Sequence, residues 1–292
     1  MKWRRGTGAG QVGDLRGRGG LGGSGVPIPI GVGGGGIGLV LLLVLYLLGG
    51  LGGGGGGTTG FPINLPAAGA PDRSMAQAPP ADDEQAQFVQ FVVGNVQDTW
   101  RQIFAEAGQT YEPTKLYLFE QGVSTGCGTA PSAVGPFYCP ADRGVYVDLS
   151  FFRELSQRFG APGDFAQAYV IAHEFGHHVQ NLLGVSDDVN RQQQEEPTSA
   201  NELSVRLELQ ADCLAGVWAH SAYTQQLLEP GDLEEGLGAA AAVGDDRIQK
   251  QSGRQIDRES WTHGSSQQRQ HWFNQGFRGG DPSNCETFQG NV

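Results

Sequence analysis

Two histidines and a glutamate in the segment Ala172-His173-Glu174-Phe175-Gly176-His177 have the types and spacing of a metal-dependent hydrolytic centre. On an α-helix, residues four apart lie one turn apart on one face, so His173 and His177 can bind one zinc ion together. Glu174 lies beside them and stays free to act as a base toward water. The alternative is a surface helix with two histidines and a solvated glutamate.

The surrounding sequence favours a helix. Apolar residues recur at three- and four-residue spacing and form one face: Phe165, Ala168, Ala172, Phe175, Val179 and Leu182. We expect the helix to begin at Gly163 or Asp164 and to end near Gly184, since glycine is a common C-terminal stop. His178 points to another side, and we predict that it is exposed or hydrogen-bonded and is not a ligand.

A catalytic zinc ion needs a third protein ligand and an open fourth position. The segment 202–218 predicts a second amphipathic helix, with Glu208 at the border of its apolar face and Asp212 one turn further on the same side. We expect Glu208 to bind the metal. Asp212 would accept the second ring N–H of a ligand histidine and so fix its tautomer. A solvated acidic face is the alternative.

Nearer the C-terminus, His263 precedes a predicted helix from about Gln267 to Phe277. A histidine or tyrosine often donates a hydrogen bond to the oxyanion that forms during peptide hydrolysis, and His263 is our candidate for that role. Tyr146 is a second candidate. The alternative for His263 is a ring that packs locally at the helix start.

Four cysteines are compatible with an exported, oxidised domain. Cys127 and Cys139 flank a loop that contains glycine and proline, which a disulfide would close. Cys213 and Cys285 would then form the second bridge. Four cysteines allow three connectivities, so the pairing stays open.

Charge excludes one class of partner. The formal net charge is −12, and the region up to residue 71 is net basic, so the acidic charge lies in the remainder. Such a surface repels phosphate backbones, and we therefore expect no nucleic-acid partner.

The N-terminal region predicts a membrane anchor. Glycine occupies 25 of the first 60 residues, and no charged residue occurs between Arg18 and Asp72. We assign residues 1–26 to a basic, glycine-rich cytoplasmic tail, 27–52 to a transmembrane helix of sufficient length, and 53–81 to a Gly/Pro/Ala-rich linker. The chain would then cross the membrane once and leave residues 82–292 outside the cytoplasm. A cleaved signal peptide is the alternative.

The region 82–292 predicts an α+β domain of zincin type, helix-rich with a small sheet. Helices are expected at 85–107 and 151–159 and around the alanine run 239–242. Short strands are expected at 115–119 and 144–149. The polar segment 186–200 is expected to be a loop.

The chain resembles the bacterial family of predicted neutral zinc metallopeptidases, the YpfJ-like proteins. The shared segments run from the Met1-Lys2-Trp3-Arg4 start through Thr125-Gly126-Cys127-Gly128 to the histidine motif, and on to Thr262-His263-Gly264. The Glu-x-x-Ala-Asp portion that ends at Asp212 is also similar to the third-ligand helix of membrane-associated gluzincin peptidases. That resemblance implies Glu208 as ligand and Asp212 as its supporting acid.

Together these observations predict a membrane-anchored zinc endopeptidase that acts on a protein or peptide substrate. His173, His177 and Glu208 would hold one zinc ion, with Glu174 as general base and His263 beside the oxyanion. The rival hypothesis is a zinc-stabilised binding or assembly module at the membrane without turnover. A free Glu174 argues against it, because a structural zinc site closes all four positions with protein ligands.

Overall fold

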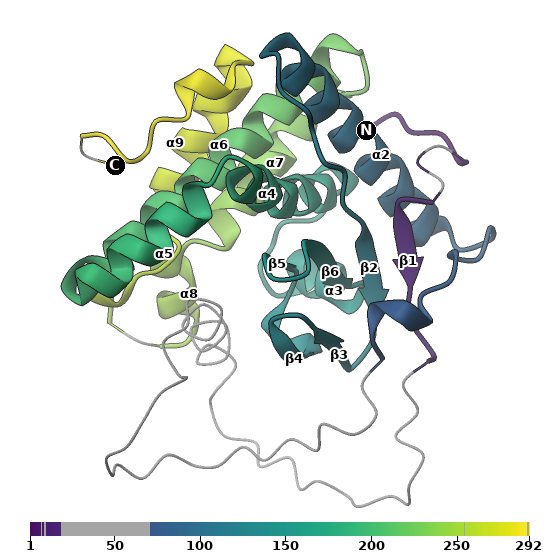
Figure 1. Cartoon of the computed structure of the whole chain (residues 1–292), viewed down its shortest axis with the longest axis horizontal. Coiled ribbons are helices and arrows are strands. Elements are labelled where there is room, and N and C mark those ends of the chain that lie inside the picture. Colours follow the sequence, from purple (N-terminus) through teal and green to yellow (C-terminus); the bar gives the residue numbers. More distant parts are fainter. Residues whose placement is uncertain (7, 9, 19–70, 254, 291) are drawn as a thin grey trace, which may run out of the picture.

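The computed structural model describes residues 1–6, 8, 10–18, 71–253, 255–290 and 292. Figure 1 shows helices gathered on one side of a small sheet, which is the mixed α+β architecture expected from the sequence. The helices are α2 (Glu84–Glu106), α3 (Ser150–Gln157), α4 (Asp164–Leu182), α5 (Val185–Glu195), α6 (Ala200–Thr224), α7 (Asp232–Ala242), α8 (Asp245–Gln251) and α9 (Ser266–Gly279).

The main sheet has four strands in the order β1 (Val12–Asp14), β2 (Leu116–Phe119), β6 (Gly144–Asp148) and β5 (Phe137–Cys139). The first three are parallel, and β5 runs antiparallel to β6 with Phe137 opposite Tyr146. Every residue of β2 and β6 is buried. Full burial explains why both read as nearly continuous apolar runs. A separate hairpin joins β3 (Gly122–Thr125) to β4 (Gly128–Pro131).

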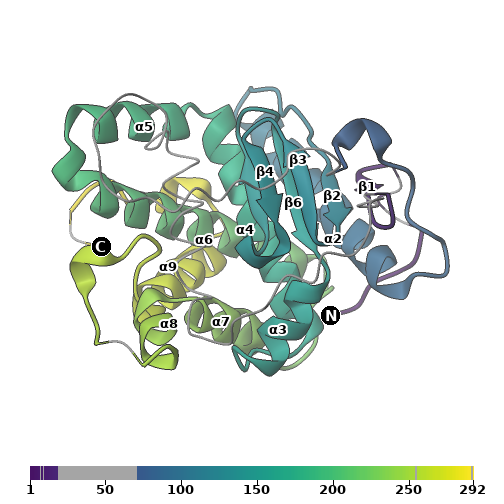
Figure 2. The same cartoon turned by 90° about the horizontal axis from the view of Figure 1, so that it is seen from below.

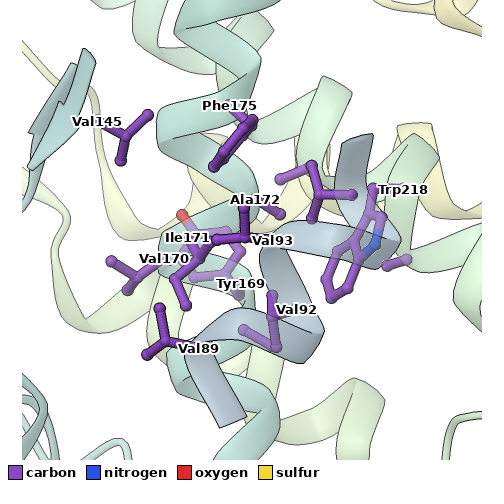
Figure 3. Packing of buried hydrophobic residues seen from close by; sticks show 14 of the residues in the cluster. Val89, Val92, Val93, Val145, Tyr169, Val170, Ile171, Ala172, Phe175 and Trp218 are labelled. Atoms are coloured by element: carbon purple, nitrogen blue, oxygen red, sulfur yellow. The ribbon is translucent and has the colours of Figure 1, made fainter. Parts of the chain in front are cut away.

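Helix α4 runs through the centre of the main core. Its side toward α2 and the sheet is apolar, and Figure 3 shows this packing: Val89, Val92 and Val93 of α2 lie near Ile171, Ala172 and Phe175 of α4. Phe165 at the start of α4 stacks on Trp218 of α6. The packing of this apolar side holds α4 in place. His177 lies on the opposite face of the helix and is partly exposed.

Close backbone approaches bring α4, α6 and α9 together. A Cβ at Gly176 would lie 3.0 Å from the carbonyl oxygen of Ala211, so α4 and α6 nearly touch there. Between α6 and α9 the approach is closer still, because a Cβ at Gly276 would lie 1.9 Å from the carbonyl oxygen of Cys213. A Cβ at Gly276 could not be accommodated without a backbone shift, and one at Gly176 would be unusually close to its neighbour.

One predicted loop is helical. The segment expected as a loop, 186–200, instead forms α5 and a short 3₁₀ turn. Only Val189 and Gln193 of α5 are buried, so the helix carries almost no apolar stripe that a sequence pattern could register.

Both cysteine pairs favoured by the sequence lie at bonding distance. Cys127–Cys139 links the β3–β4 hairpin to β5, and Cys213–Cys285 ties α6 to the C-terminal segment. The second bridge leaves α6 directly after Asp212, where it holds the C-terminal segment against that part of the helix.

Of the segment predicted as a tail, 1–26, the residues that the structure describes up to Arg18 pack against the domain, while 19–26 lie outside the described residues. Strand β1 pairs with β2, and the ammonium group of Met1 donates hydrogen bonds to Asp164 at 2.6 Å and to Asp232 at 3.3 Å. Gly8 lies against Gly94 of α2, with no room for a Cβ on either residue. The glycines that suggested a flexible tail allow close packing here.

The predicted linker is corrected in the same way for its last part. Asp72 and Gln77 form single backbone bridges with Ser124 and Asp14. The described domain therefore begins before residue 82.

In the part of the chain that the structure describes, no helix has the length and apolar character to cross a membrane. The predicted transmembrane segment, 27–52, lies outside the described residues and stays a prediction.

Candidate metal centre

His173 and His177 lie one turn apart on α4, with ring centroids 4.8 Å from each other. Both Nε2 atoms face one carboxylate, that of Glu208 on α6: the distances are 3.1 Å from His173 to Oε2 and 3.4 Å from His177 to Oε1. One ligand atom from each of the three residues lies within 4.8 Å of the other two. The residues proposed from the sequence are thus brought together.

The far side of each imidazole is held by an oxygen acceptor. His173 Nδ1 lies 2.9 Å from Asp212 Oδ1, and His177 Nδ1 lies 2.8 Å from Gln180 Oε1. The amide of Gln180 has a defined orientation, because its nitrogen donates to the carbonyl of Leu207 at 2.7 Å. An Nδ1–H donated to oxygen leaves the Nε2 lone pair free for a metal.

Beneath His173, Asp212 is fully buried and accepts hydrogen bonds from several donors. The guanidinium group of Arg269, on α9, donates to it from Nε at 2.7 Å and from Nη2 at 2.9 Å. The hydroxyl of Tyr169, one turn before His173, donates to the same carboxylate. This network fixes Asp212 as an acceptor for His173.

Charge at this cluster favours a cation. Burial opposes ionisation of Glu208, yet His177 and His173 lower its pKa well below the ordinary value. Asp212 is buried too, and Arg269 and His173 lower its pKa. The ionised Glu208 carboxylate and the two imidazoles form a set of one oxygen and two nitrogen ligands, which zinc takes as three protein ligands. The residues present therefore fit a zinc ion.

Glu174 stands apart from this network. Its side chain is 7% exposed, and its Oε2 is buried without a hydrogen-bond partner. Burial raises the pKa of the carboxyl, although His177 and His173 act in the opposite direction. A buried carboxylate with an unpaired oxygen is costly unless a ligand or water completes it.

His263 reaches the same cavity from the segment before α9. Its Nδ1 lies 3.2 Å from Oδ1 of Asp245, the first residue of α8. Oδ2 of Asp245 also accepts the backbone N–H groups of Thr262, His263 and Gly264 at 2.7 to 3.1 Å. Burial disfavours the charged ring, but the hydrogen bond with Asp245 raises the pKa of His263.

A cavity of about 250 Å³ opens over these residues. Its lining comes from α3, α4, α5, α6, α8, the β5 edge and the segment around His263, and the helices can be followed in Figure 2. The charged and histidine side chains in the described lining are His173, Glu174, His177, Glu208, His263 and Arg269. Most other lining residues are apolar.

His178, predicted not to be a ligand, and Tyr146, the second candidate for the oxyanion role, lie elsewhere. His178 is 1% exposed, with Nε2 2.8 Å from the Glu112 carbonyl and Nδ1 3.1 Å from the Tyr138 hydroxyl. Of the two environments predicted for it, the hydrogen-bonded one is correct and the exposed one is wrong. Tyr146 is fully buried in a second core cluster and donates to Asp142 at 2.7 Å, so it does not line the cavity.

Comparison with known proteins identifies a family and several bacterial relatives. A family model described as "Putative neutral zinc metallopeptidase" matches residues 1–288. The chain belongs to that family. The protein of Escherichia coli strain K12 named uncharacterized protein YpfJ is 54% identical over 211 residues, which are 72% of this chain and 73% of the relative.

More distant relatives occur in mycobacteria. Uncharacterized protein Rv2575 of Mycobacterium tuberculosis strain H37Rv is 51% identical over 189 residues, which are 61% of this chain and 63% of that protein. No solved structure matches the chain.

Three residues that support the site, Gln180, Asp245 and Arg269, were not predicted from the sequence. Gln180 follows His177 by three positions, a helical spacing at which its side chain can reach that ring, and this signal was present. Asp245 and Arg269 lie far from the histidine motif in sequence. Only the packing of α8 and α9 brings them to it.

Proposed function

We propose that this protein is a zinc-dependent endopeptidase whose centre consists of His173, His177, Glu208 and Glu174. The observation that carries the proposal is the convergence of two imidazole Nε2 atoms and one carboxylate beside a second, unpaired carboxylate, at the wall of a cavity. Zinc held by the first three residues would lower the pKa of a water molecule and polarise a substrate carbonyl.

Glu174 acts as the base in this proposal. Its free oxygen accepts a proton from water as the water oxygen bonds to the peptide carbonyl carbon. The carbon–nitrogen bond then breaks, and Glu174 delivers the proton to the departing amine. Its burial raises its pKa, which suits a group that must both accept and release a proton near neutral pH.

His263 assists by donating from Nε2 to the carbonyl oxygen, where negative charge develops. Because Nδ1–H is donated to Asp245, Nε2 carries a proton only when the ring is charged. The raised pKa of His263 therefore keeps the donor form populated to higher pH.

For localisation, we propose that the domain lies outside the cytoplasm, near the membrane. The two disulfides support this, since such bridges persist in oxidising compartments. The uncharged segment 27–52 supports a membrane association. Residues 1–18 would lie on the same side as the domain.

The test is peptide cleavage by the full chain in detergent, with a peptide library read by mass spectrometry and zinc content measured in parallel. We expect cuts by the wild type, and about a hundredfold or greater loss in Glu174→Gln with zinc retained. Glu234→Gln, an exposed residue of α7, is the matched control and should cut normally. Zinc binding with no cuts by the wild type would favour the binding-module hypothesis instead.

A further inference from the structure

The cavity has two chemically distinct sides. One holds the charged and histidine side chains of the candidate metal centre. The other is apolar and is contributed by separate elements: Phe151 of α3, Phe159 after it, Val170 of α4, Val243 and Ile248 of the α7–α8 region, and Pro136 before β5. We call these six residues the apolar wall.

The apolar wall adjoins the proposed catalytic groups. Val170 precedes His173 by three positions and Glu174 by four, so it lies one turn earlier on the same part of α4. Ile248 lies on α8, the short helix whose first residue, Asp245, holds His263. A substrate carbonyl between Glu174 and His263 would therefore place a neighbouring side chain against this wall.

Packing and a hydrogen bond hold residues of the apolar wall in place. The rings of Phe151 and Phe159 lie 6.5 Å apart, and Phe151 also packs against Gly135. The guanidinium group of Arg247 donates to the Phe159 carbonyl at 2.9 Å and so ties that residue to α8. Phe151 and Phe159 are partly exposed, which leaves apolar surface of the wall available to a ligand.

The size and charge of the cavity define which kind of substrate side chain it accommodates. A cavity of roughly 150 Å³ with apolar walls is enough to bind benzene, and this one is about 250 Å³. Arg269 is engaged with Asp212, and His173, His177 and Glu208 form the metal cluster. Glu174 and His263 are the proposed base and oxyanion donor. Against the apolar wall, a charged substrate side chain would lose its hydration without gaining a partner, since none of the six wall residues carries a charge.

We propose that the apolar wall is the subsite for an aromatic or large aliphatic side chain beside the scissile bond. The enzyme would then be selective for apolar sequences. The role of the apolar wall as a substrate subsite rests on the proposed peptidase function. Its preference for apolar groups can be measured by binding alone.

The experiment uses the full chain and a series of blocked peptides that differ at one position: Phe, Leu, Ala, Asp or Lys. We expect kcat/KM for Phe and Leu to exceed the values for Asp and Lys by about ten- to a hundredfold. The same preference should appear in binding to Glu174→Gln, with lower Kd values for the Phe and Leu peptides than for the Asp and Lys peptides. Equal values across the series, in turnover or in binding, would overturn the subsite.

A variant adds a second, independent readout. Ile248→Arg should reduce kcat/KM for the Phe peptide and raise it for the Asp peptide, while Ile256→Arg, a 46% exposed isoleucine outside the cavity lining, should change neither. An unchanged preference in a folded Ile248→Arg protein would also overturn the proposal. If the wild type binds Phe peptides selectively but cuts none, the subsite stands and the peptidase function fails.

Discussion

Arg269 holds Asp212 with two hydrogen bonds, at 2.7 and 2.9 Å, and both side chains are buried beneath the imidazole of His173. Neither residue is among the three proposed metal ligands. The pair nevertheless sets the orientation of His173, since Asp212 is the acceptor for its Nδ1. Support of this kind for a ligand histidine commonly changes metal affinity by about 10- to 100-fold.

The first prediction concerns a variant that lacks the guanidinium group of Arg269. Arg269→Met leaves Asp212 charged and buried with fewer donors, so we expect a loss of about 3–5 kcal/mol in unfolding free energy and weaker zinc binding. Thermal melts and competition with a chelator would measure both. Arg191→Met is the control, because its pair with Asp188 is exposed and should contribute below about 1 kcal/mol. Equal melting temperatures for the two variants would contradict the prediction.

The distance in sequence between these residues shows where sequence reasoning stops. Helical periodicity predicts α4 and the centre of α6, because each buries one apolar face. It cannot tell that α9 packs on α6 closely enough for Arg269 to reach Asp212, 57 positions away. That approach depends on Gly216 and Gly276, whose missing side chains carry no periodic signal.

Other differences have similar causes. Strand β1 contains a glycine between Val12 and Asp14 in a glycine-rich region, so nothing local distinguishes it from a tail. Its partner, β2, lies about a hundred residues later in the chain. The pairing is therefore a long-range contact that no local sequence pattern indicates. The histidine motif needed no tertiary information, because its chemistry is contained in one helical turn.

The second prediction concerns Gln180. In Gln180→Leu, His177 loses its Nδ1 acceptor, and we expect zinc affinity to fall about 10- to 100-fold. Zinc competition measures the effect, and Gln194→Leu, at an exposed position of α5, is the control. Unchanged affinity would show that the ring keeps its orientation without Gln180.

The third prediction uses the space between α4 and α6. A Cβ at Gly176 would lie 3.0 Å from the Ala211 carbonyl oxygen, a backbone atom that cannot rotate away. Gly176→Ala should therefore cost about 1–3 kcal/mol in stability and reduce turnover, because it separates the histidines from Glu208. Gly238→Ala on α7 meets no atom within 4 Å and should stabilise the protein by up to about 1 kcal/mol. Denaturant melts of the two variants should therefore shift in opposite directions.

The fourth prediction is a pH profile. Asp245 raises the pKa of His263 despite burial, and donation from Nε2 requires the charged ring, so kcat should fall as pH rises through that pKa. Asp245→Asn lowers the pKa and should move the alkaline limb of the profile to lower pH. His263→Gln should lower kcat and abolish that limb. A limb that stays in place in Asp245→Asn would assign it to another group.

The last prediction concerns the side of the membrane on which the N-terminal segment lies. Because β1 pairs with β2 and Gly8 packs on Gly94, residues 1–18 and the domain must share one compartment when the domain is folded. Arg5→Cys and Glu234→Cys place exposed thiols on the segment and on α7. We expect a membrane-impermeant maleimide to label both from the same side of intact cells. Labelling from opposite sides would mean that the segment leaves the sheet in the membrane-bound protein, and Gly94→Leu, which blocks docking, should then leave the melting temperature unchanged.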